Sequence, residues 1–465
     1  MFDLCRFNNN IACITPYGEQ CSYSELHAMS ERIQCRLNPH QLVFCMCGNT
    51  IGSLAGYVSF VNNDDATLML DAHIEREAFN VLYETYHPRY VWAPDNFEAP
   101  MMANKIHAEK EYVLWDVEDS HTMVNSELSL LLTTSGSTGS PKLVRLSKDN
   151  LRSNALSIIE YLHITADERP VTSLPMYYSF GLSIINSHLL SGATLLLTSA
   201  SYVEREFWEF ANENSFTSFS GVPYTFEIIK KLKLWKQPMP TLRTLTQAGG
   251  KLSNELLRFF IEKYEPQGVK FYLMYGQTEA MARMSYLEPQ LGLSKLGSIG
   301  KGIPGGTFSL VDDDSKVIES ANEVGELVYE GPNVCLGYAE CASDLEKGDE
   351  NHGVLYTGDL AKRDSDGFYF IAGRKKRFLK LFGNRISLDY VETLIKSQLK
   401  ECVCVGNDSE LIVYTTDADY DEDAIIDTLV TRTKIVRNVF SVRHIDEIPR
   451  SESGKILYNR LKIDS

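Results

Sequence analysis

The sequence lacks the features that would tie this chain to a membrane or direct it out of the cell. No apolar run approaches the roughly 20 residues that a membrane-spanning helix needs. The first ten residues carry Asp3, Arg6 and three asparagines, and they do not follow the basic-then-apolar order of a signal peptide. We therefore expect a cytoplasmic protein with no membrane span.

Metal-binding cysteine pairs and an excess of basic residues are also missing. Cys45 with Cys47 and Cys402 with Cys404 are separated by one residue only, which is not the spacing of a zinc site. We expect buried, reduced thiols instead. The 45 Lys and Arg residues face 62 Asp and Glu residues, a net charge of −17. This balance argues against nucleic acid as a partner, because binding to phosphate needs a basic surface.

Short apolar segments alternate with helical patterns through the first ~240 residues, an order typical of α/β layers. The segments 42–46, 66–70 and 90–92 have the length and composition of buried strands, whereas 23–37 and 255–264 have helical periodicity. The expected fold class is therefore α/β, with a large N-terminal domain built from layered sheets.

The pattern changes after Gly297 to short strands and turns, which predicts a small β subdomain at about residues 297–373. A basic turn follows, and then a compact αβ tail with a predicted helix at 387–399 and a predicted strand at 411–415. We expect a large domain at residues 1–373 and a small C-terminal domain at residues 374–465, since a chain of 465 residues exceeds one hydrophobic core.

A loop rich in glycine and hydroxyl residues follows an apolar strand at residues 130–142 and ends in Lys142. Glycine lets backbone N–H groups approach phosphate oxygens, hydroxyls add donors, and the lysine adds positive charge. The spacing of Gly136 and Gly139 is not that of a Walker A loop.

The string at 300–305 matches G-x-G-x-x-G, but Pro304 and the absence of a strand before it exclude a dinucleotide site.

The loop at 134–142 resembles the phosphate loop of the adenylate-forming superfamily, which includes acyl- and aryl-CoA ligases, nonribosomal peptide adenylation domains and firefly luciferase. Further motifs occur in the order of that family, so the resemblance covers the chain from about residue 130 to its end. They are Met-Tyr-Gly-Gln-Thr-Glu at 274–279, the segment 325–338, Tyr-Thr-Gly-Asp at 356–359, Gly-Arg at 373–374 with Gly-Asn-Arg at 383–385, and Pro-Arg-Ser-Glu-Ser-Gly-Lys at 449–455.

The resemblance implies that ATP and Mg²⁺ bind to a set of residues from these motifs. The phosphate loop would supply Thr134, Ser135, Gly136, Ser137, Thr138, Gly139 and Lys142. In the second motif, Tyr275 and Gly276 would lie at the adenine, Thr278 would donate to the α-phosphate, and Glu279 would bind Mg²⁺.

Asp359 would accept both ribose hydroxyls, with Arg374 as a further ribose contact and Gly249 near the adenine. Lys455 would enter the site to stabilise charge on the carboxylate and α-phosphate oxygens, which makes it catalytic together with Thr134, Thr278 and Glu279. The resemblance also implies a mobile C-terminal domain that rotates about a hinge at Lys376 and delivers the Gly383 loop for thioester formation. The residue after the hinge is usually acidic in the family, and here it is Arg377.

The acid pocket is less well defined by sequence. The resemblance places Tyr178 where amino-acid-activating domains carry an aspartate, which argues against an α-amino acid because its ammonium would lack a partner. The remaining candidates are small, apolar or hydroxyl-bearing, and each is also a plausible core residue: Ser183, Gly221, Met274 and Met281.

The sequence therefore predicts an acid–thiol ligase that forms an acyl-adenylate from a non-amino acid and transfers the acyl group to CoA or to the phosphopantetheine of a carrier protein acting in trans. A D-alanine-type carrier-protein ligase is the nearest alternative. A catalytically silent homologue and an enzyme that stops at the adenylate, or passes it to an amine, are the others.

Overall fold

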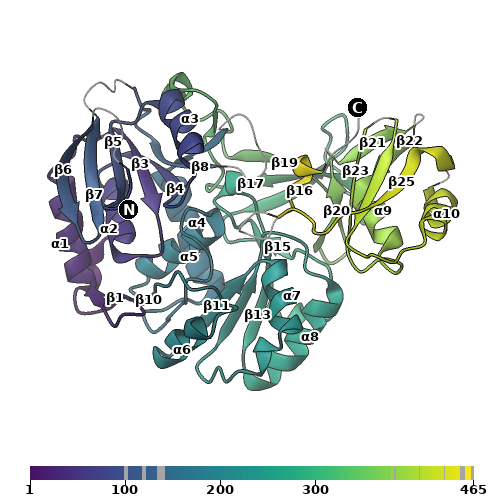
Figure 1. The fold of residues 1–465 in the computed structure, drawn as a ribbon, viewed down its shortest axis with the longest axis horizontal. Helices are drawn as coiled ribbons and strands as arrows, with labels where there is room; N and C mark the ends of the chain where they lie inside the picture. Colours follow the sequence, from purple (N-terminus) through teal and green to yellow (C-terminus); the bar gives the residue numbers. More distant parts are fainter. Residues whose placement is uncertain are drawn as a thin grey trace. The chain divides into compact units, whose positions relative to one another are not determined.

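The computed structural model describes residues 1–98, 103–117, 122–133, 142–375, 377–381, 384–407, 409–433, 435–450 and 456–461. The chain forms two compact units (Figure 1). Unit 1 comprises Met1–Thr307 and Tyr329–Leu355, and unit 2 comprises Phe308–Val328 and Tyr356–Ser465. The predicted boundary between residues 373 and 374 stays a prediction.

The largest sheet of unit 1 has eight strands in the order β18-β9-β8-β4-β3-β5-β7-β6. Its four central strands are parallel, and antiparallel strands extend it at both ends. In chain order these strands are β3 (Leu42–Cys47), β4 (Ala66–Asp71), β5 (Tyr90–Pro94), β6 (Ala103–Glu109), β7 (Tyr112–Val117), β8 (Leu128–Thr133), β9 (Leu143–Ser147) and β18 (Gly337–Ala339).

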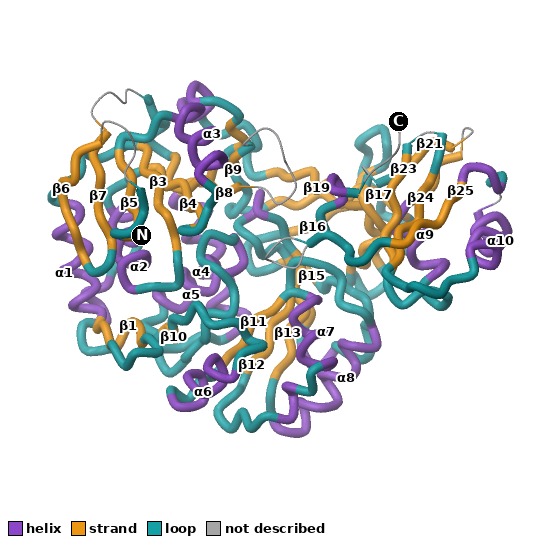
Figure 2. The backbone as a smooth tube through the Cα atoms, in the orientation of Figure 1, coloured by secondary structure: helices purple, strands orange, loops and turns teal. Residues whose placement is uncertain are grey.

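Helices cover this sheet on both faces, as Figure 2 shows. They are α1 (Tyr23–Gln34), α2 (Ile51–Asn62), α3 (Arg76–Tyr86), α4 (Lys148–Leu162) and α5 (Ser179–Leu190). All six residues of β3 are buried, and they alternate between two apolar clusters. Val43 and Cys45 pack with α1 and α2, whereas Phe44 and Met46 pack with α3. Continuous apolar strands of this kind are expected where both faces of a parallel sheet are covered.

A second sheet of unit 1 has the order β11-β12-β13-β14-β15, with its first three strands parallel. Its strands are β11 (Ser218–Gly221), β12 (Thr244–Gln247), β13 (Lys270–Tyr275), β14 (Ser285–Leu287) and β15 (Lys301–Gly302), and its helices are α6 (Arg205–Glu213), α7 (Pro223–Lys231) and α8 (Asn254–Tyr264). A small sheet joins β10 (Leu195–Leu196), β1 (Ile11–Ile14) and β2 (Gln20–Ser22).

Unit 2 holds most of a four-stranded sheet and the C-terminal αβ region. The sheet has the order β16-β17-β19-β20, formed by β16 (Thr307–Val311), β17 (Val324–Glu330), β19 (Val354–Arg363) and β20 (Tyr369–Arg374). The αβ region contains β21 (Phe378–Leu381), β22 (Asn384–Ser387), α9 (Leu388–Ile395), β23 (Cys402–Gly406), β24 (Leu411–Thr415), α10 (Glu422–Thr433) and β25 (Phe440–His444). Its core joins both helices to the β23-β24-β25 sheet.

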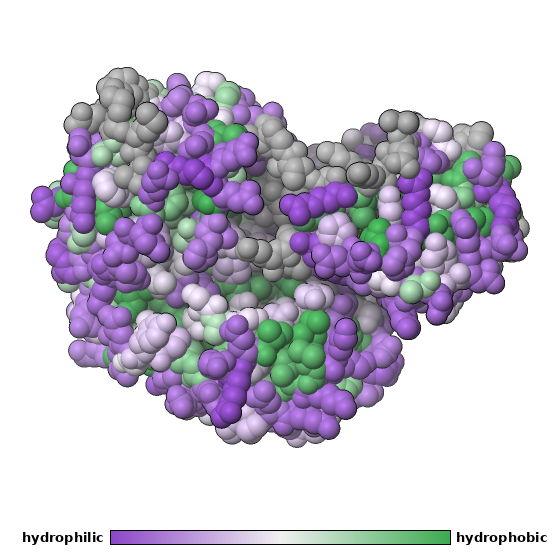
Figure 3. All heavy atoms as spheres, viewed as in Figure 1, coloured by the Kyte–Doolittle hydropathy of each residue, from purple (hydrophilic) through white to green (hydrophobic). Residues whose placement is uncertain are grey.

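The surface and the thiols agree in part with what the sequence predicts. Hydrophilic side chains cover most of the face drawn in Figure 3. None of the helices in the described ranges has the length and apolar character needed to cross a membrane. All ten cysteines are free, as predicted, but Cys5, Cys35 and Cys341 are exposed, so the expectation of burial is wrong for these three.

Candidate active site

Several predicted site residues lie outside the described residues. These are Thr134, Ser135, Gly136, Ser137, Thr138, Gly139, Lys376, Gly383 and Lys455. The strand β8 ends at Thr133, before the predicted phosphate loop, and Lys142 lies directly before β9. Because β8 and β9 are antiparallel neighbours in the eight-stranded sheet, the residues on either side of the predicted loop lie at the same end of these two strands.

Three predicted or neighbouring side chains of unit 1 form a chain of polar contacts. The Lys142 ammonium lies 3.7 Å from the centre of the Tyr338 ring, within range of a cation–π interaction. The Tyr338 hydroxyl donates to Glu279 Oε1 over 3.0 Å. Burial and the neighbouring Glu279 charge raise the pKa of Tyr338, so its hydroxyl keeps its proton and remains a donor. The predicted phosphate-loop lysine and the predicted metal ligand are therefore linked through one tyrosine.

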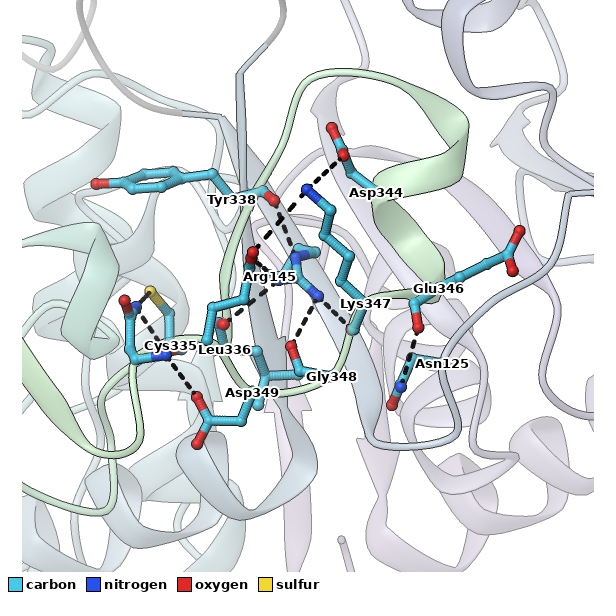
Figure 4. A network of polar contacts seen from close by, with 12 residues as sticks. Asn125, Arg145, Cys335, Leu336, Tyr338, Asp344, Glu346, Lys347, Gly348 and Asp349 are labelled. Carbon is cyan, nitrogen blue, oxygen red and sulfur yellow. Dashed lines mark hydrogen bonds and ion pairs between the residues drawn. The ribbon is translucent and has the colours of Figure 1, made fainter.

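A fully buried arginine fixes the strand that carries Tyr338. Arg145 on β9 donates to Tyr338 O over 3.0 Å and to Gly348 O over 3.2 Å, and it forms an ion pair with Glu350. Figure 4 shows the guanidinium surrounded by backbone carbonyls, which belong to Leu336 directly before β18, to Tyr338 within it and to Gly348 after it. Each carbonyl accepts a charge-assisted hydrogen bond, so the network compensates the buried charge and holds Tyr338 in place.

The predicted motif at 274–279 bends sharply after β13. Glu279 lies in a short 3₁₀ turn, η4 (Thr278–Ala280), and the next two residues, Met281 and Ala282, both adopt left-handed φ angles of 52° and 78°. Such backbone costs about 1–3 kcal/mol per residue and is often found at functional sites. A side chain on Gly276 would place its Cβ 1.9 Å from Ala282 O, so only glycine fits this bend.

Thr278 and Tyr275 have partners within unit 1. The Thr278 hydroxyl lies 3.2 Å from the Ser179 hydroxyl at the start of α5. The Tyr275 hydroxyl, at the end of β13, accepts a hydrogen bond from Gln277 Nε2 over 3.3 Å. The N-terminus of α5 is thus in contact with the residue that is expected to meet the α-phosphate.

Tyr178 and Gly249, predicted at the acid and at the adenine, face each other. Gly249 has a left-handed φ of 82°, and a Cβ there would lie 2.8 Å from the Tyr178 hydroxyl. Burial raises the pKa of Tyr178 to about 12, so the side chain is neutral at physiological pH. Gly221, at the end of β11, is equally close to Thr225, with 2.8 Å between a Cβ on Gly221 and Thr225 Cγ2.

The structure brings two of the pocket candidates together around Arg283 and separates a third. Arg283 Nε donates to the Ser183 hydroxyl over 3.0 Å, and its Nη1 lies 3.4 Å from Met274 Sδ. Met281, by contrast, packs in the apolar cluster beneath β8 and β9, with Leu132 and others.

In unit 2, the two predicted ribose-binding residues are neighbours on adjacent strands. Asp359 on β19 lies opposite Arg374 on β20, and Arg374 Nε is 3.0 Å from Asp359 Oδ1. The carboxylate is only 4% exposed, whereas the arginine is 52% exposed. An ionised carboxylate accepts several hydrogen bonds, so Asp359 can hold Arg374 and still accept from a ligand hydroxyl.

Replacing Asp359 with asparagine is expected to raise the KM for ATP about tenfold, because hydrogen bonds to a charged acceptor contribute about 1.5–3 kcal/mol and neutral ones about 1 kcal/mol. Pyrophosphate release at varied ATP measures this. Asp419→Asn, at an exposed position of the same unit, is the matched control. An unchanged KM in Asp359→Asn would contradict the ribose assignment.

The residues around Glu279 fit a magnesium ion. Oε1 accepts from Tyr338, and Oε2 makes no hydrogen bond to any residue that the structure describes, which leaves it for a cation. Mg²⁺ prefers oxygen ligands and is commonly bound by one or two carboxylates together with substrate phosphates. The neighbouring Thr278 hydroxyl, which is expected to donate to the α-phosphate, lies on the same short turn.

The most informative sequence matches agree with these motifs. The profile of a family described as AMP-binding enzyme matches residues 6–339, so the match begins well before the first motif at about residue 130. The indoleacetate–CoA ligase of Aromatoleum aromaticum is 27% identical over 341 residues, which are 70% of this chain and 65% of that protein. A feruloyl-CoA synthase of an Amycolatopsis species is 27% identical over 358 residues, 72% and 70% of the two chains. The matched region thus spans about two thirds of the length of these relatives.

A solved structure shares the fold over nearly the whole chain. The o-succinylbenzoate CoA synthetase of Bacillus subtilis, in complex with its acyl-adenylate intermediate, has a TM-score of 0.81 at 22% identity and covers 99% of this chain and 98% of its own. In complex with ATP and a magnesium ion, the same enzyme gives a TM-score of 0.79 at 21% identity, with 98% of each chain covered. The predicted α/β fold class is confirmed.

The family profile covers well over half of the chain and includes Lys142, Glu279 and Tyr338. Together with relatives named as a CoA ligase and a CoA synthase, it confirms the family and the enzyme class that the motifs predicted. The chain belongs to the AMP-binding enzyme family.

Proposed function

We propose that this protein joins a non-amino carboxylic acid to the thiol of CoA through an acyl-adenylate. A carboxylate oxygen of the acid attacks the α-phosphorus of ATP, and the bond to the leaving pyrophosphate breaks. The CoA sulfur then attacks the acyl carbonyl carbon, AMP leaves with the bonding electrons, and the thiol proton passes to solvent. The linkage of Lys142, Tyr338 and Glu279 is the observation that supports this reaction most directly.

The side chains of this chain would act by positioning and by charge. Glu279 and the Thr278 hydroxyl would hold Mg²⁺ and the α-phosphate, and Lys142 would neutralise phosphate charge. Bound Mg²⁺ would supply charge neutralisation on the phosphate oxygens. Asp359 and Arg374 would hold the ribose, and Lys455 would stabilise the charge that develops during adenylation. Transfer at phosphorus needs little more than such positioning and electrostatic stabilisation.

The neutral state of Tyr178 supports a non-amino acid as substrate. An α-amino acid brings an ammonium group into the pocket, and a buried cation needs an anionic partner. Tyr178 supplies a protonated hydroxyl instead, because burial raises its pKa to about 12. A D-alanine-type ligase would need a carboxylate at this position to pair with the ammonium, and this chain has Tyr178 there.

CoA is the proposed thiol, because the relatives named above are CoA ligases. We propose the cytoplasm as the compartment, since both ATP and CoA are available there. We also propose that residues 374–465 form the mobile domain, with Lys376 as its hinge and the Gly383 loop serving the second step.

The test is pyrophosphate release from Mg-ATP over a panel of carboxylic and amino acids, with hydroxylamine present to trap the adenylate. Release with a non-amino acid, followed by thioester formation when CoA replaces hydroxylamine, is the expected result. Release with amino acids alone would show that the interpretation of Tyr178 is wrong. Turnover of a carrier-bound phosphopantetheine but not of CoA would exclude CoA as the acceptor.

A further inference from the structure

Among the described residues of unit 1, two arginine side chains are fully buried, and they differ in whether a carboxylate balances their charge. Arg145 is compensated by Glu350 and by backbone carbonyls. Arg283 is 1% exposed, and no carboxylate in the described ranges lies within ion-pair distance of its guanidinium. An arginine keeps its charge even when buried, so Arg283 places an uncompensated cation inside unit 1.

The groups around Arg283 are neutral. Its Nε donates to the Ser183 hydroxyl over 3.0 Å, and Nη1 donates to the Tyr161 hydroxyl over 3.3 Å and to Met274 Sδ over 3.4 Å. The guanidinium carbon lies 5.0 Å from the centre of the Phe180 ring. These contacts orient the side chain, but none brings a negative charge, and Nη2 makes no hydrogen bond to the part of the chain that the structure describes.

The backbone holds Arg283 in this position. Asn154 Nδ2 donates to Arg283 O over 2.8 Å, and Asn333 Nδ2 bridges Ala280 O and Arg283 O over 2.8 and 3.2 Å. The Tyr329 hydroxyl in turn donates to Asn333 Oδ1 over 2.8 Å. The segment between these carbonyls is the left-handed bend at Met281 and Ala282, so Arg283 is placed by a rigid turn that follows Glu279 directly.

Arg283 also lies among the residues assigned to the acid. Ser183 and Met274, two of the predicted pocket residues, are in contact with its guanidinium. Its Cα is next to Gly276, where an added Cβ would be 2.9 Å away. The uncompensated charge therefore belongs to the same part of unit 1 as the proposed acid pocket.

We propose that Arg283 binds a second anionic group of the acid, so that the substrate is a dicarboxylic acid. One carboxylate reacts with the α-phosphorus, and the other accepts hydrogen bonds from Arg283 Nη2, with the neighbouring hydroxyls of Ser183 and Tyr161 orienting the guanidinium. A carboxylate supplies the negative charge that the surroundings of Arg283 lack, and it accepts a charge-assisted hydrogen bond from Nη2. This proposal rests on the proposed ligase function, and it makes Arg283 a specificity-determining residue.

The test compares malonate, succinate, glutarate and phthalate with their monoamides, which have nearly the same shape and one negative charge fewer. Turnover is measured as pyrophosphate release with hydroxylamine. Binding is measured separately by titration calorimetry in the presence of magnesium and α,β-methylene ATP. At least one dianion is expected to exceed its monoamide in kcat/KM and in affinity by about 30-fold or more, the effect of losing one partner of a buried charge pair.

The variant Arg283→Met is expected to lose this preference. Its kcat/KM for the dianion falls by about 30-fold or more, whereas the value for the monoamide stays within about threefold. Arg283→Lys keeps the charge and is expected to retain part of the preference. Arg258→Met, at an exposed position on α8, is the matched control and leaves both values unchanged. Arg283→Gln gives the same test if the methionine variant does not fold.

Equal binding of each dianion and its monoamide, or an equal loss of both in Arg283→Met, would overturn the proposal. If no acid causes release of pyrophosphate, the proposed ligase function is wrong. The calorimetric comparison of each dianion with its monoamide still tests whether Arg283 binds the second carboxylate. Dianion binding that is lost in Arg283→Met alone supports the site, and an absence of dianion binding in the parent protein overturns it.

Discussion

Replacing Glu279 with glutamine is expected to slow pyrophosphate release by about 100- to 1,000-fold at saturating ATP and acid, the usual cost of removing one preorganised electrostatic contact at a reacting phosphate. Glutamine keeps the size of the side chain and can still accept from the Tyr338 hydroxyl. The change therefore removes negative charge with little disturbance of packing. The apparent affinity for Mg²⁺ should fall in parallel, which a magnesium titration of the same reaction measures.

The control for this variant is Glu262→Gln on α8, whose carboxylate is 58% exposed and is paired with Arg258. It should keep the parental rate. The melting temperature of Glu279→Gln should match that of the parent. The position is only half-buried, and the hydrogen bond from the Tyr338 hydroxyl is retained. A rate for Glu279→Gln close to that of the control, with an unchanged magnesium requirement, would remove Glu279 from the metal site.

The motifs predicted those parts of the site that depend on residues close together in the sequence. Glu279 and Thr278 share one short turn, and Asp359 and Arg374 face each other across the β19–β20 hairpin. Strand positions were also predictable, since residues 42–46 lie within β3 (Leu42–Cys47), where both faces are buried and the run is wholly apolar.

The sequence could not identify the residues that act through distant partners. Tyr338 meets Glu279 across 59 residues, and Arg145 meets Glu350 across 205. Nothing local distinguishes Arg283 from a surface arginine, because its burial depends on α4, α5 and β13. One signal was present for Tyr338: it ends the segment 325–338, which the family resemblance had already singled out.

Helix ends were also less predictable than helix positions. The helix predicted at 23–37 ends at Gln34, because Arg36 and Leu37 donate to Ile33 and Gln34 and so form tighter i to i−3 turns. The helix predicted at 387–399 ends at Ile395, where Gln398 donates back to Ile395 O in the same way. Periodicity continues past such turns, and only the backbone hydrogen bonds show where the α-helix stops.

Arg377, the basic residue after the predicted hinge, is a structural centre of the C-terminal αβ region. Its guanidinium is 14% exposed, forms ion pairs with Asp389 and Glu392, and donates to Cys404 O over 2.8 Å. It also lies 4.1 Å from the centre of the Tyr458 ring. Glu392, 2.7 Å from Arg377 Nη2, also accepts from Cys404 N. The arginine at this position, directly before β21, is therefore bound to α9 through two ion pairs and to β23 through one hydrogen bond.

Arg377→Ala is expected to destabilise this region by about 3 kcal/mol, the lower part of the range for breaking a buried ion pair, because it leaves Glu392 buried without its partner. Hydrogen exchange of the full chain, followed over α9 and β23, measures the loss of protection. Arg437→Ala is the matched control: Arg437 pairs with Asp423 and Asp427 but is 45% exposed, so its loss should cost less than about 1 kcal/mol.

The loss of stability in Arg377→Ala, called the deficit below, should depend on pH because of Glu392. Burial raises the pKa of Glu392 above its usual value of 4.5, and Arg377 opposes that rise by favouring the carboxylate. Without Arg377 the folded-state pKa rises further, so ionised Glu392 disfavours folding at neutral pH. The deficit should be largest above this raised pKa and should shrink as the pH falls toward 4.5, where Glu392 is protonated in the folded protein. A deficit that is independent of pH would show that Arg377 stabilises the region through packing on Tyr458 and not through its charge.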